Sequence, residues 1–195
     1  MVIDQLKIVF SHFDDSTELV SYKELASGHI NDTYLVETTN KEKFVLQRIN
    51  HGVFKDVPGL INNKVSISKH IQNKLSYLPK NERDRKVLTF LSTKEGAPFY
   101  YGKSGGYWNM MVYIDNSLTF ERVTNEEVAY EGGKLIGDFL NLTSDFDANL
   151  LIDVIPKFHD MSFRFSQFED SLKVASKERL EQAKSYIDVV WSLKD

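Results

Sequence analysis

The sequence contains no cysteine, and this absence excludes several kinds of chemistry at once. Without thiols the chain forms no disulfide bond, no thiolate zinc site and no cysteine nucleophile. It also has no apolar run approaching the roughly 20 residues that a transmembrane helix needs. The segment MVIDQLKIVFSHFDDS lacks the basic and apolar regions of a secretory signal peptide, so we expect a cytoplasmic protein without a membrane partner.

Positive charge is not in excess either. The chain has 24 Lys and Arg against 28 Asp and Glu, for a formal net charge of −4. Nucleic-acid binders usually carry a basic surface, so we expect no nucleic-acid partner. The 195 residues are 42% hydrophobic and 27% charged, which is enough for one domain, or for two small lobes, with a buried core.

Hydrophobic periodicity predicts a helix followed by a run of strands. Apolar residues recur at helical spacing over residues 2–13. Three strand-like segments follow at 18–26, 30–39 and 43–49, and residues 39–42 have the composition of a hairpin turn.

A second helix is predicted from Asp56 to about residue 76. Asp56 is a typical capping residue, and Pro58 is tolerated in the first turn, where its missing N–H has no helical partner. The mixed charges of residues 80–86 indicate a solvent-exposed loop. Further strands are predicted at 86–91, 99–103 and 107–114, with Ser104-Gly105-Gly106 as the turn between the last two.

From Thr124 onward the pattern is helical. Thr124 and Glu127 have the spacing of a capping box, and the last helix extends from Ser176 to about residue 193. The change from strands to helices predicts an α+β protein of two parts, a strand-rich part at residues 1–115 and a helical part at residues 116–195. A cleft between two such parts is a common site for a small molecule.

Three segments resemble a known family. Residues 27–36 read SGHINDTYLV and are followed by FVLQRIN at 44–50, residues 108–114 read WNMMVYI, and residues 155–160 read IPKFHD with Arg164 downstream. In this order they resemble the N-acetylhexosamine 1-kinases of the aminoglycoside-phosphotransferase and choline-kinase-like group. The resemblance implies a protein-kinase-like N-terminal lobe, made of an antiparallel sheet plus a helix, and the first helices of a helical C-terminal lobe. It also implies ATP and Mg²⁺ as cofactors and an amino sugar as substrate, phosphorylated at its anomeric hydroxyl.

A glycine turn suits the phosphates of ATP. Gly28 has no Cβ, so backbone N–H groups can approach a phosphate closely. The resemblance places Gly28 and His29 in the turn that covers the phosphates, with Asn31 and Thr33 as added side-chain donors. An ordinary hairpin turn is the alternative.

The third strand is where kinases of this kind carry a cation. Alternation puts Val45 and Gln47 on one face of this strand and Arg48 on the other. Alignment with the kinase V-A-I-K pattern places Gln47 at the cation position, and the helix that follows has no acidic residue after its cap. The usual Lys–Glu pair is therefore absent, and an amide pair of Gln47 with Asn62 or Asn63 is one replacement. Val45, Gln47 and Arg48 are candidate nucleotide contacts, and the choice between Gln47 and Arg48 as the phosphate contact stays open.

The resemblance places the adenine-binding hinge near Val112–Asp115, where the base would bind the backbone, with Val112 and Tyr113 as the candidate contacts and Met111 as a gatekeeper candidate. For the neighbouring Met110 and Met111 we expect core packing rather than contact with the base.

His159, Asp160 and Arg164 are the candidate substrate residues. His159 and Asp160 offer a donor and an acceptor for sugar hydroxyl or acetamido groups, and Arg164 would hold the segment in place. In the alternative, Phe158 lies in the core and Asp160 caps a helix.

The catalytic motif of these kinases is not found. They carry their base in H-x-D-x-x-x-x-N and a magnesium ligand in a later acidic segment. His12-Phe13-Asp14 begins like the first motif, but Leu19 stands where asparagine is needed, and Asp138-Phe139-Leu140 lies within a predicted helix. We therefore expect no catalytic residue and no metal ligand in this chain, which would be the inactive N-terminal portion of a parent kinase. A truncated helical part would expose apolar surface and favour self-association.

Two other functions are considered. The sequence does not support a sulfatase, and a non-catalytic binding module stays open. Relatives of such kinases have carried the label mucin desulfatase, but no proline here lies in the C/S-x-P-x-R frame of the usual sulfatases. A non-catalytic nucleotide-binding or sugar-binding module would keep the turn and the hinge without a base. Within the kinase interpretation, choline, homoserine or aminoglycoside substrates remain possible.

Overall fold

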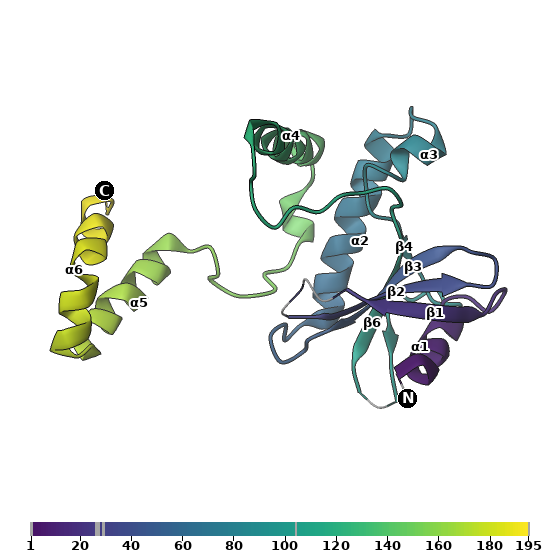
Figure 1. Ribbon diagram of the computed structural model, residues 1–195, viewed down its shortest axis with the longest axis horizontal. Helices are drawn as coiled ribbons and strands as arrows, with labels where there is room; N and C mark the ends of the chain where they lie inside the picture. The colour runs from purple at the N-terminus through teal and green to yellow at the C-terminus, as the bar shows by residue number, and fades with distance from the viewer. Residues whose placement is uncertain (1, 26–27, 29, 104, 195) are drawn as a thin grey trace. The chain divides into compact units, whose positions relative to one another are not determined.

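A six-stranded antiparallel sheet forms the centre of the first part of the chain. The computed structural model describes residues 2–25, 28, 30–103 and 105–194. The sheet order is β1-β2-β3-β6-β4, with β5 pairing β6 (Figure 1). The strands are β1 (Leu19–Glu24), β2 (Asp32–Thr38), β3 (Lys43–Ile49), β4 (Phe90–Leu91), β5 (Tyr100–Tyr101) and β6 (Tyr107–Val112).

Helices precede, interrupt and follow this sheet, so the α+β prediction is confirmed. They are α1 (Val2–Ser11), α2 (Val57–Lys74), the short α3 (Lys80–Arg83), α4 (Glu126–Thr143), α5 (Met161–Val174) and α6 (Lys177–Ser192), with a 3-10 turn at Ala148–Leu150. No helix among the described residues has both the length and the apolar character needed to cross a bilayer.

The two faces of the sheet are covered by different helices. On one face, Leu46 of β3 belongs to a buried cluster with Phe10 of α1 and Trp108 of β6. On the other face, Ile49 packs against Val57 and Ile61 of α2. Successive strand residues point to opposite faces, so β3 presents alternate side chains to α1 on one face and to α2 on the other (Figure 1).

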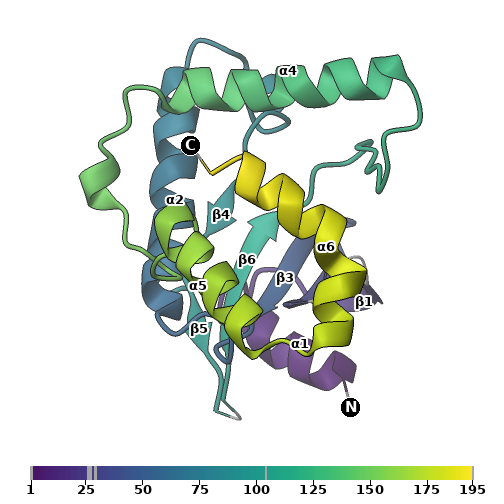
Figure 2. The same cartoon turned by 90° about the vertical axis from the view of Figure 1, so that its left-hand side faces the viewer.

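Helix α2 begins where the sequence predicts. The Asp56 side chain accepts a hydrogen bond from the Gly59 N–H at 2.9 Å, which satisfies one of the unpaired donors of the first turn. Near the other end of the helix, Ile71 and Leu75 form a small cluster to which Leu142 of α4 adds. The C-terminal part of α4 therefore lies beside α2 (Figure 2).

A glycine hairpin joins β5 to β6. Gly105 has a φ of +81° and Gly106 a φ of +123°, a region that side chains other than glycine rarely adopt. The Gly102 N–H donates to the Gly106 carbonyl at 2.9 Å and closes the turn. The predicted turn is confirmed at these glycines, while Ser104 lies outside the described residues.

The short strands differ from the prediction. Segments 86–91 and 99–103 were expected to be full strands, but only two residues of each pair with a neighbour. The register gives the reason. Phe90 already lies opposite Met111, and β6 ends at Val112, so residues 86–89 have almost no strand to pair with. Tyr101 lies opposite Tyr107, so the residues after it belong to the hairpin turn.

Two local predictions on charge and capping need correction. The segment 80–86, expected as a loop, begins with α3, and Lys80 forms an ion pair with Asp84 one turn later.

The predicted capping box at Thr124 is wrong. Asn125 caps α4 instead, because its side-chain oxygen accepts from the Val128 N–H at 2.9 Å.

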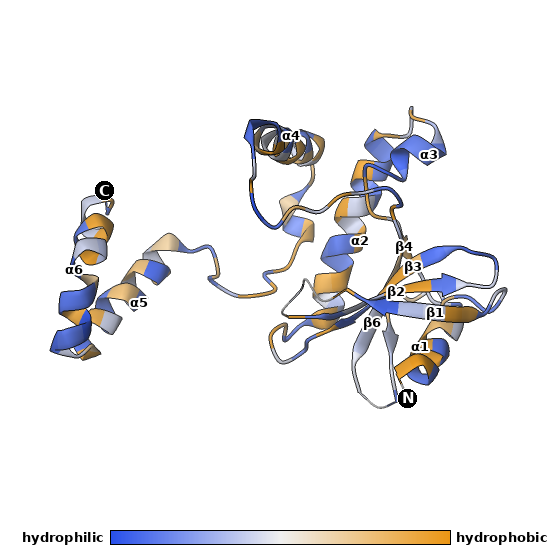
Figure 3. Ribbon diagram, in the orientation of Figure 1, coloured by the Kyte–Doolittle hydropathy of each residue, from blue (hydrophilic) through white to orange (hydrophobic). Residues whose placement is uncertain are grey.

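The chain divides into two compact units, residues 1–154 and 155–195. The division predicted after residue 115 falls inside the first unit and stays a prediction. The second unit is an α5–α6 pair held by Phe165, Phe168 and Trp191, whose rings lie 5.3 to 6.0 Å apart. In the first unit, α4 carries both hydrophobic and hydrophilic residues, and none of them is buried (Figure 3).

Candidate functional site

Four polar side chains meet on the α2 side of the sheet. The Gln47 amide nitrogen donates to the Thr33 hydroxyl at 3.2 Å, and the Lys64 ammonium of α2 donates to the Gln47 amide oxygen at 3.0 Å. In the orientation that satisfies both ends of its amide, Asn109 donates to the Gln47 carbonyl at 3.2 Å and accepts from Lys64 at 3.1 Å. Register makes this possible, because Gln47 lies opposite Thr33 on one side and Asn109 on the other.

The predicted amide pair between Gln47 and the helix is wrong. Asn63 is engaged elsewhere: its side chain donates to the Ile152 carbonyl at 2.9 Å and accepts from the Ile152 N–H at 3.2 Å. Asn62 is exposed. The α2 residue that contacts Gln47 is Lys64, which is a cation rather than an amide.

Lys64 is the residue that sequence reasoning missed, and the sequence contains a signal for it. Ile61 and Ser68 are buried on α2, and Lys64 is three residues from one and four from the other. This spacing puts Lys64 on the sheet-facing side of the helix. Its surroundings lower the pKa of Lys64 to about 8, because burial disfavours the charged ammonium.

Of the residues predicted to cover the phosphates, Gly28, Asn31 and Thr33 are described. Gly28 and Ile30 are exposed, and the nearest atom to a Cβ built at Gly28 would be the Asn31 carbonyl oxygen at 3.9 Å. The Asn31 side chain accepts from the Asn50 N–H at 3.0 Å, so it fastens the start of β2 to the end of β3. His29, also predicted to contact the nucleotide, lies outside the described residues.

An apolar strip continues from the polar cluster along the same face. Val45 lies opposite Leu35 of β2 and Met111 of β6, and it is partly exposed. Met110 and Met111 are 1% and 7% exposed, so the prediction of core packing for the two methionines is confirmed. Val45 and Leu35 therefore offer a hydrophobic surface next to polar Gln47.

The backbone of the predicted hinge is already hydrogen-bonded in part. The Val112 N–H donates to the Thr89 carbonyl at 3.0 Å and the Tyr113 N–H donates to the Lys43 carbonyl at 3.1 Å. A base at this position would have to use carbonyl oxygens or later amides. The Lys43 ammonium lies 3.0 Å from the Asp115 carboxylate, and this hydrogen bond raises the pKa of Lys43.

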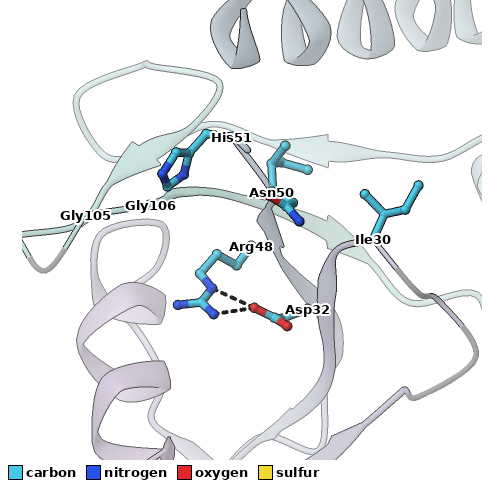
Figure 4. Close-up of a pocket in the computed structure, with 8 residues that line it drawn as sticks. Ile30, Asp32, Arg48, Asn50, His51, Gly105 and Gly106 are labelled. Atoms are coloured by element: carbon cyan, nitrogen blue, oxygen red, sulfur yellow. Dashed lines mark hydrogen bonds and ion pairs between the residues drawn. The ribbon is translucent and has the colours of Figure 1, made fainter. Parts of the chain in front are cut away.

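Arg48 lies on the opposite face from Gln47. Its guanidinium binds the Asp32 carboxylate at 2.7 Å and lies 6.0 Å from the centre of the Trp108 ring. Figure 4 shows this pair beside a pocket of about 300 Å³, which His51 also lines. The structure thus separates Arg48 from the polar cluster and pairs its charge with a carboxylate.

The predicted substrate residues lie together in the second unit. The Asp160 side chain accepts from the Phe163 N–H at 2.9 Å and caps α5, as the alternative interpretation predicts. Arg164 donates to the Phe158 carbonyl at 3.0 Å, so it does hold the segment. Phe158 is 51% exposed, which makes its placement in the core wrong, and His159 packs edge-on against the Phe158 ring.

The first of the two segments that resemble catalytic motifs makes structural contacts. His12 stacks on Tyr100 with ring centres 3.8 Å apart, Phe13 is buried, and Asp14 accepts from the Ser16 N–H. Asp138 lies within α4. Within the described ranges, no group of three or more His, Asp or Glu side chains is arranged to hold a metal ion.

These observations define the class of the protein as α+β, with an antiparallel sheet flanked by helices and a lysine-centred polar cluster on one face. No family model matches the chain.

Proposed function

We propose that the first unit holds ATP against the α2 side of its sheet, as the N-terminal part of a small-molecule kinase acting on the anomeric hydroxyl of an N-acetylhexosamine. The observation that carries the proposal is the direct contact between Gln47 of β3 and Lys64 of α2. In protein kinases the same two elements, the third strand and the helix after it, face each other through a Lys–Glu pair beside the phosphates.

Three further features support a nucleotide at this face. Gly28, the glycine of the predicted phosphate-covering turn, is exposed and precedes β2, whose Thr33 belongs to the polar cluster. Val45 and Leu35 supply an apolar surface for a base. The third feature is the resemblance of residues 27–50 and 108–114 to the sugar kinases.

Calorimetric titration of the purified chain with ATP and Mg²⁺ tests the proposal. We expect saturable binding, and Val45→Phe should weaken it at least about tenfold by filling the space for the base. Val20→Phe is the matched control, because Val20 is a 48% exposed strand valine on β1. An absence of ATP binding by the folded wild-type chain would refute the proposal.

Phosphoryl transfer is a separate expectation. The sequence has no H-x-D-x-x-x-x-N segment, so we expect the chain by itself to make no N-acetylhexosamine 1-phosphate from ATP and the sugar. Sustained formation of that product would contradict this expectation. The same missing motif favours a second candidate, a non-catalytic module that binds a nucleotide or a sugar. The coding sequence downstream separates the two, because only a parent kinase would carry the motif.

A further inference from the structure

Among the residues that the structure describes, Lys64 has neutral partners only. The groups that face its ammonium are the Gln47 amide oxygen of β3 at 3.0 Å, the Asn109 amide oxygen of β6 at 3.1 Å, and the Phe90 ring of β4, whose centre is 5.3 Å away. None of these carries a charge. Within the part of the chain that the structure describes, no carboxylate lies within ion-pair distance of Lys64.

One hydrogen of the ammonium is left over. A lysine ammonium has three N–H donors, and the two amide oxygens take two of them. Among the described residues no third oxygen accepts from Lys64. A partly buried cation that keeps a free donor and has no counter-ion is suited to an anion that arrives from outside.

The other candidate cation at these strands is already neutralised. Arg48 binds the Asp32 carboxylate on the opposite face of β3, so its charge is balanced and directed away from the cluster. Lys64 shares its face with Thr33 and Val45, which are partly exposed. A ligand that lies along this face would meet the apolar strip and Lys64 in succession.

We propose that Lys64 of α2 is the cation that binds the phosphates of a nucleoside triphosphate in this chain, in place of a lysine on the third strand. The proposal rests on the proposed function and adds to it the residue that contacts the ligand's charge. Gln47 and Asn109 are then positioning residues, since they hold the ammonium by its other two hydrogens.

The ionisation of Lys64 gives a readout that needs no mutation. Its pKa of about 8 means that roughly half of the free protein lacks this proton at pH 8. A phosphate beside the ammonium favours the charged form, so ATP binding at pH 8 should take up a proton. Adenosine, which has no phosphate, should bind without this uptake. Calorimetry in buffers of different ionisation enthalpy measures the difference.

Variants supply the second readout. Lys64→Gln and Lys64→Met should weaken ATP binding by about tenfold or more, as loss of a charge-assisted contact does, and leave adenosine binding within about twofold. Two variants are needed in case one does not fold, which circular dichroism reports. Lys69→Gln is the matched control, because Lys69 is an exposed lysine on the same helix. It should match the wild type for both ligands.

The outcomes separate the two proposals. If ATP and adenosine bind wild type and both Lys64 variants equally, and ATP binding at pH 8 takes up no proton, the role of Lys64 is refuted while the nucleotide site stands. If the folded wild type binds neither ligand, the proposed function fails and the role of Lys64 fails with it. Proton uptake with ATP alone, together with selective loss of ATP binding in the variants, supports both.

Discussion

Asn63 of α2 forms two hydrogen bonds with the backbone of Ile152. Its amide nitrogen donates to the Ile152 carbonyl at 2.9 Å and its amide oxygen accepts from the Ile152 N–H at 3.2 Å. A side-chain amide that pairs in this way imitates a backbone partner in a sheet. The contact fastens the segment after the 3-10 turn to α2, 89 residues earlier in the chain.

We expect Asn63→Ala to destabilise the first unit by about 1–2 kcal/mol, because two hydrogen bonds to the backbone are lost at a site that water reaches. Urea unfolding measures the change. Asn62→Ala is the control, since Asn62 is the exposed neighbour on the same helix and should change stability by less than about 0.5 kcal/mol. Equal effects of the two substitutions would contradict this role of the Asn63–Ile152 contact.

Gly59→Ala tests the same contact from the other side. An alanine Cβ at this position would lie 2.0 Å from the Ile152 Cδ1 and 2.6 Å from the Asp56 carboxylate that caps α2. Both atoms end side chains that can move, and Ile152 is 40% exposed, so we expect Gly59→Ala to stabilise α2 by less than the roughly 1 kcal/mol that alanine normally gives a helix.

The Gly59→Ala and Ile152→Ala double-mutant cycle should show a coupling of at least about 0.5 kcal/mol, because the smaller side chain removes the clash. Gly137→Ala in α4 is the control: no atom lies within 4 Å of its added Cβ, so it should stabilise the helix by up to about 1 kcal/mol. Additive effects of Gly59→Ala and Ile152→Ala would show that the close approach is not the cause.

The ionisation of Lys64 predicts how stability depends on pH. The pKa of Lys64 is about 8 in the folded chain, and in the unfolded chain it has the ordinary value of 10.5. Between these two pH values the unfolded chain therefore binds more protons than the folded chain does. The free energy of unfolding should therefore rise with pH over this window, by on the order of 1–3 kcal/mol. Below pH 8 the cost of burying the charge is fully present, and above pH 10.5 it is gone.

Lys64→Met should remove this part of the pH dependence. The measurement is the free energy of unfolding of the wild type and of Lys64→Met at several pH values from 7 to 11. The difference between the two proteins should change across the window, while Lys69→Met should track the wild type. A constant difference between wild type and Lys64→Met would show that the pKa of Lys64 is not lowered by folding.

Strand-like composition and capping chemistry predict much of this fold from the sequence. The segments predicted at 30–39 and 43–49 contain β2 and β3, each with three consecutive apolar residues, and Asp56 with Pro58 marks the start of α2. The lengths of β4 and β5 were not predictable locally. They depend on where β6 begins and ends relative to each strand, which is a tertiary relationship.

The site was predicted in part, for a similar reason. Thr33, Val45 and Gln47 do lie on one face, as alternation requires, and Arg48 lies on the other. Lys64 was not predicted because a lysine in a helix is usually solvated, and the kinase pattern has a carboxylate at this helix. The pairing of Asn63 with Ile152 joins residues far apart in the chain, and no local pattern indicates it.

Self-association is expected to involve α4. Leu135 and Phe139 are 69% and 45% exposed on this helix, and they line a groove of about 750 Å³ beside α2. A second copy of the chain would bury this surface at high concentration. Sedimentation velocity over a range of protein concentrations should show a rising average mass, which Leu135→Glu should suppress and Glu131→Gln should leave unchanged. A concentration-independent monomer would contradict the expectation.

Substitutions of Asp160 can distinguish a structural role of this residue from a substrate-binding role. Its side chain caps α5 through the Phe163 N–H, so Asp160→Ala should cost about 1 kcal/mol and speed hydrogen exchange in the first turn of the helix. Asp160→Asn keeps a capping oxygen and should retain the slow exchange, while it removes the negative charge.

Sugar binding by Asp160 is tested by titration with N-acetylglucosamine. If Asp160 also accepts from a sugar hydroxyl, both substitutions should weaken this binding. The asparagine oxygen is already used by the cap, and it is a weaker acceptor than a carboxylate. Faster exchange in Asp160→Asn equal to that in Asp160→Ala would contradict the capping role. Sugar binding that is unchanged in Asp160→Asn and weakened only in Asp160→Ala would show that the residue acts on the sugar only by holding α5.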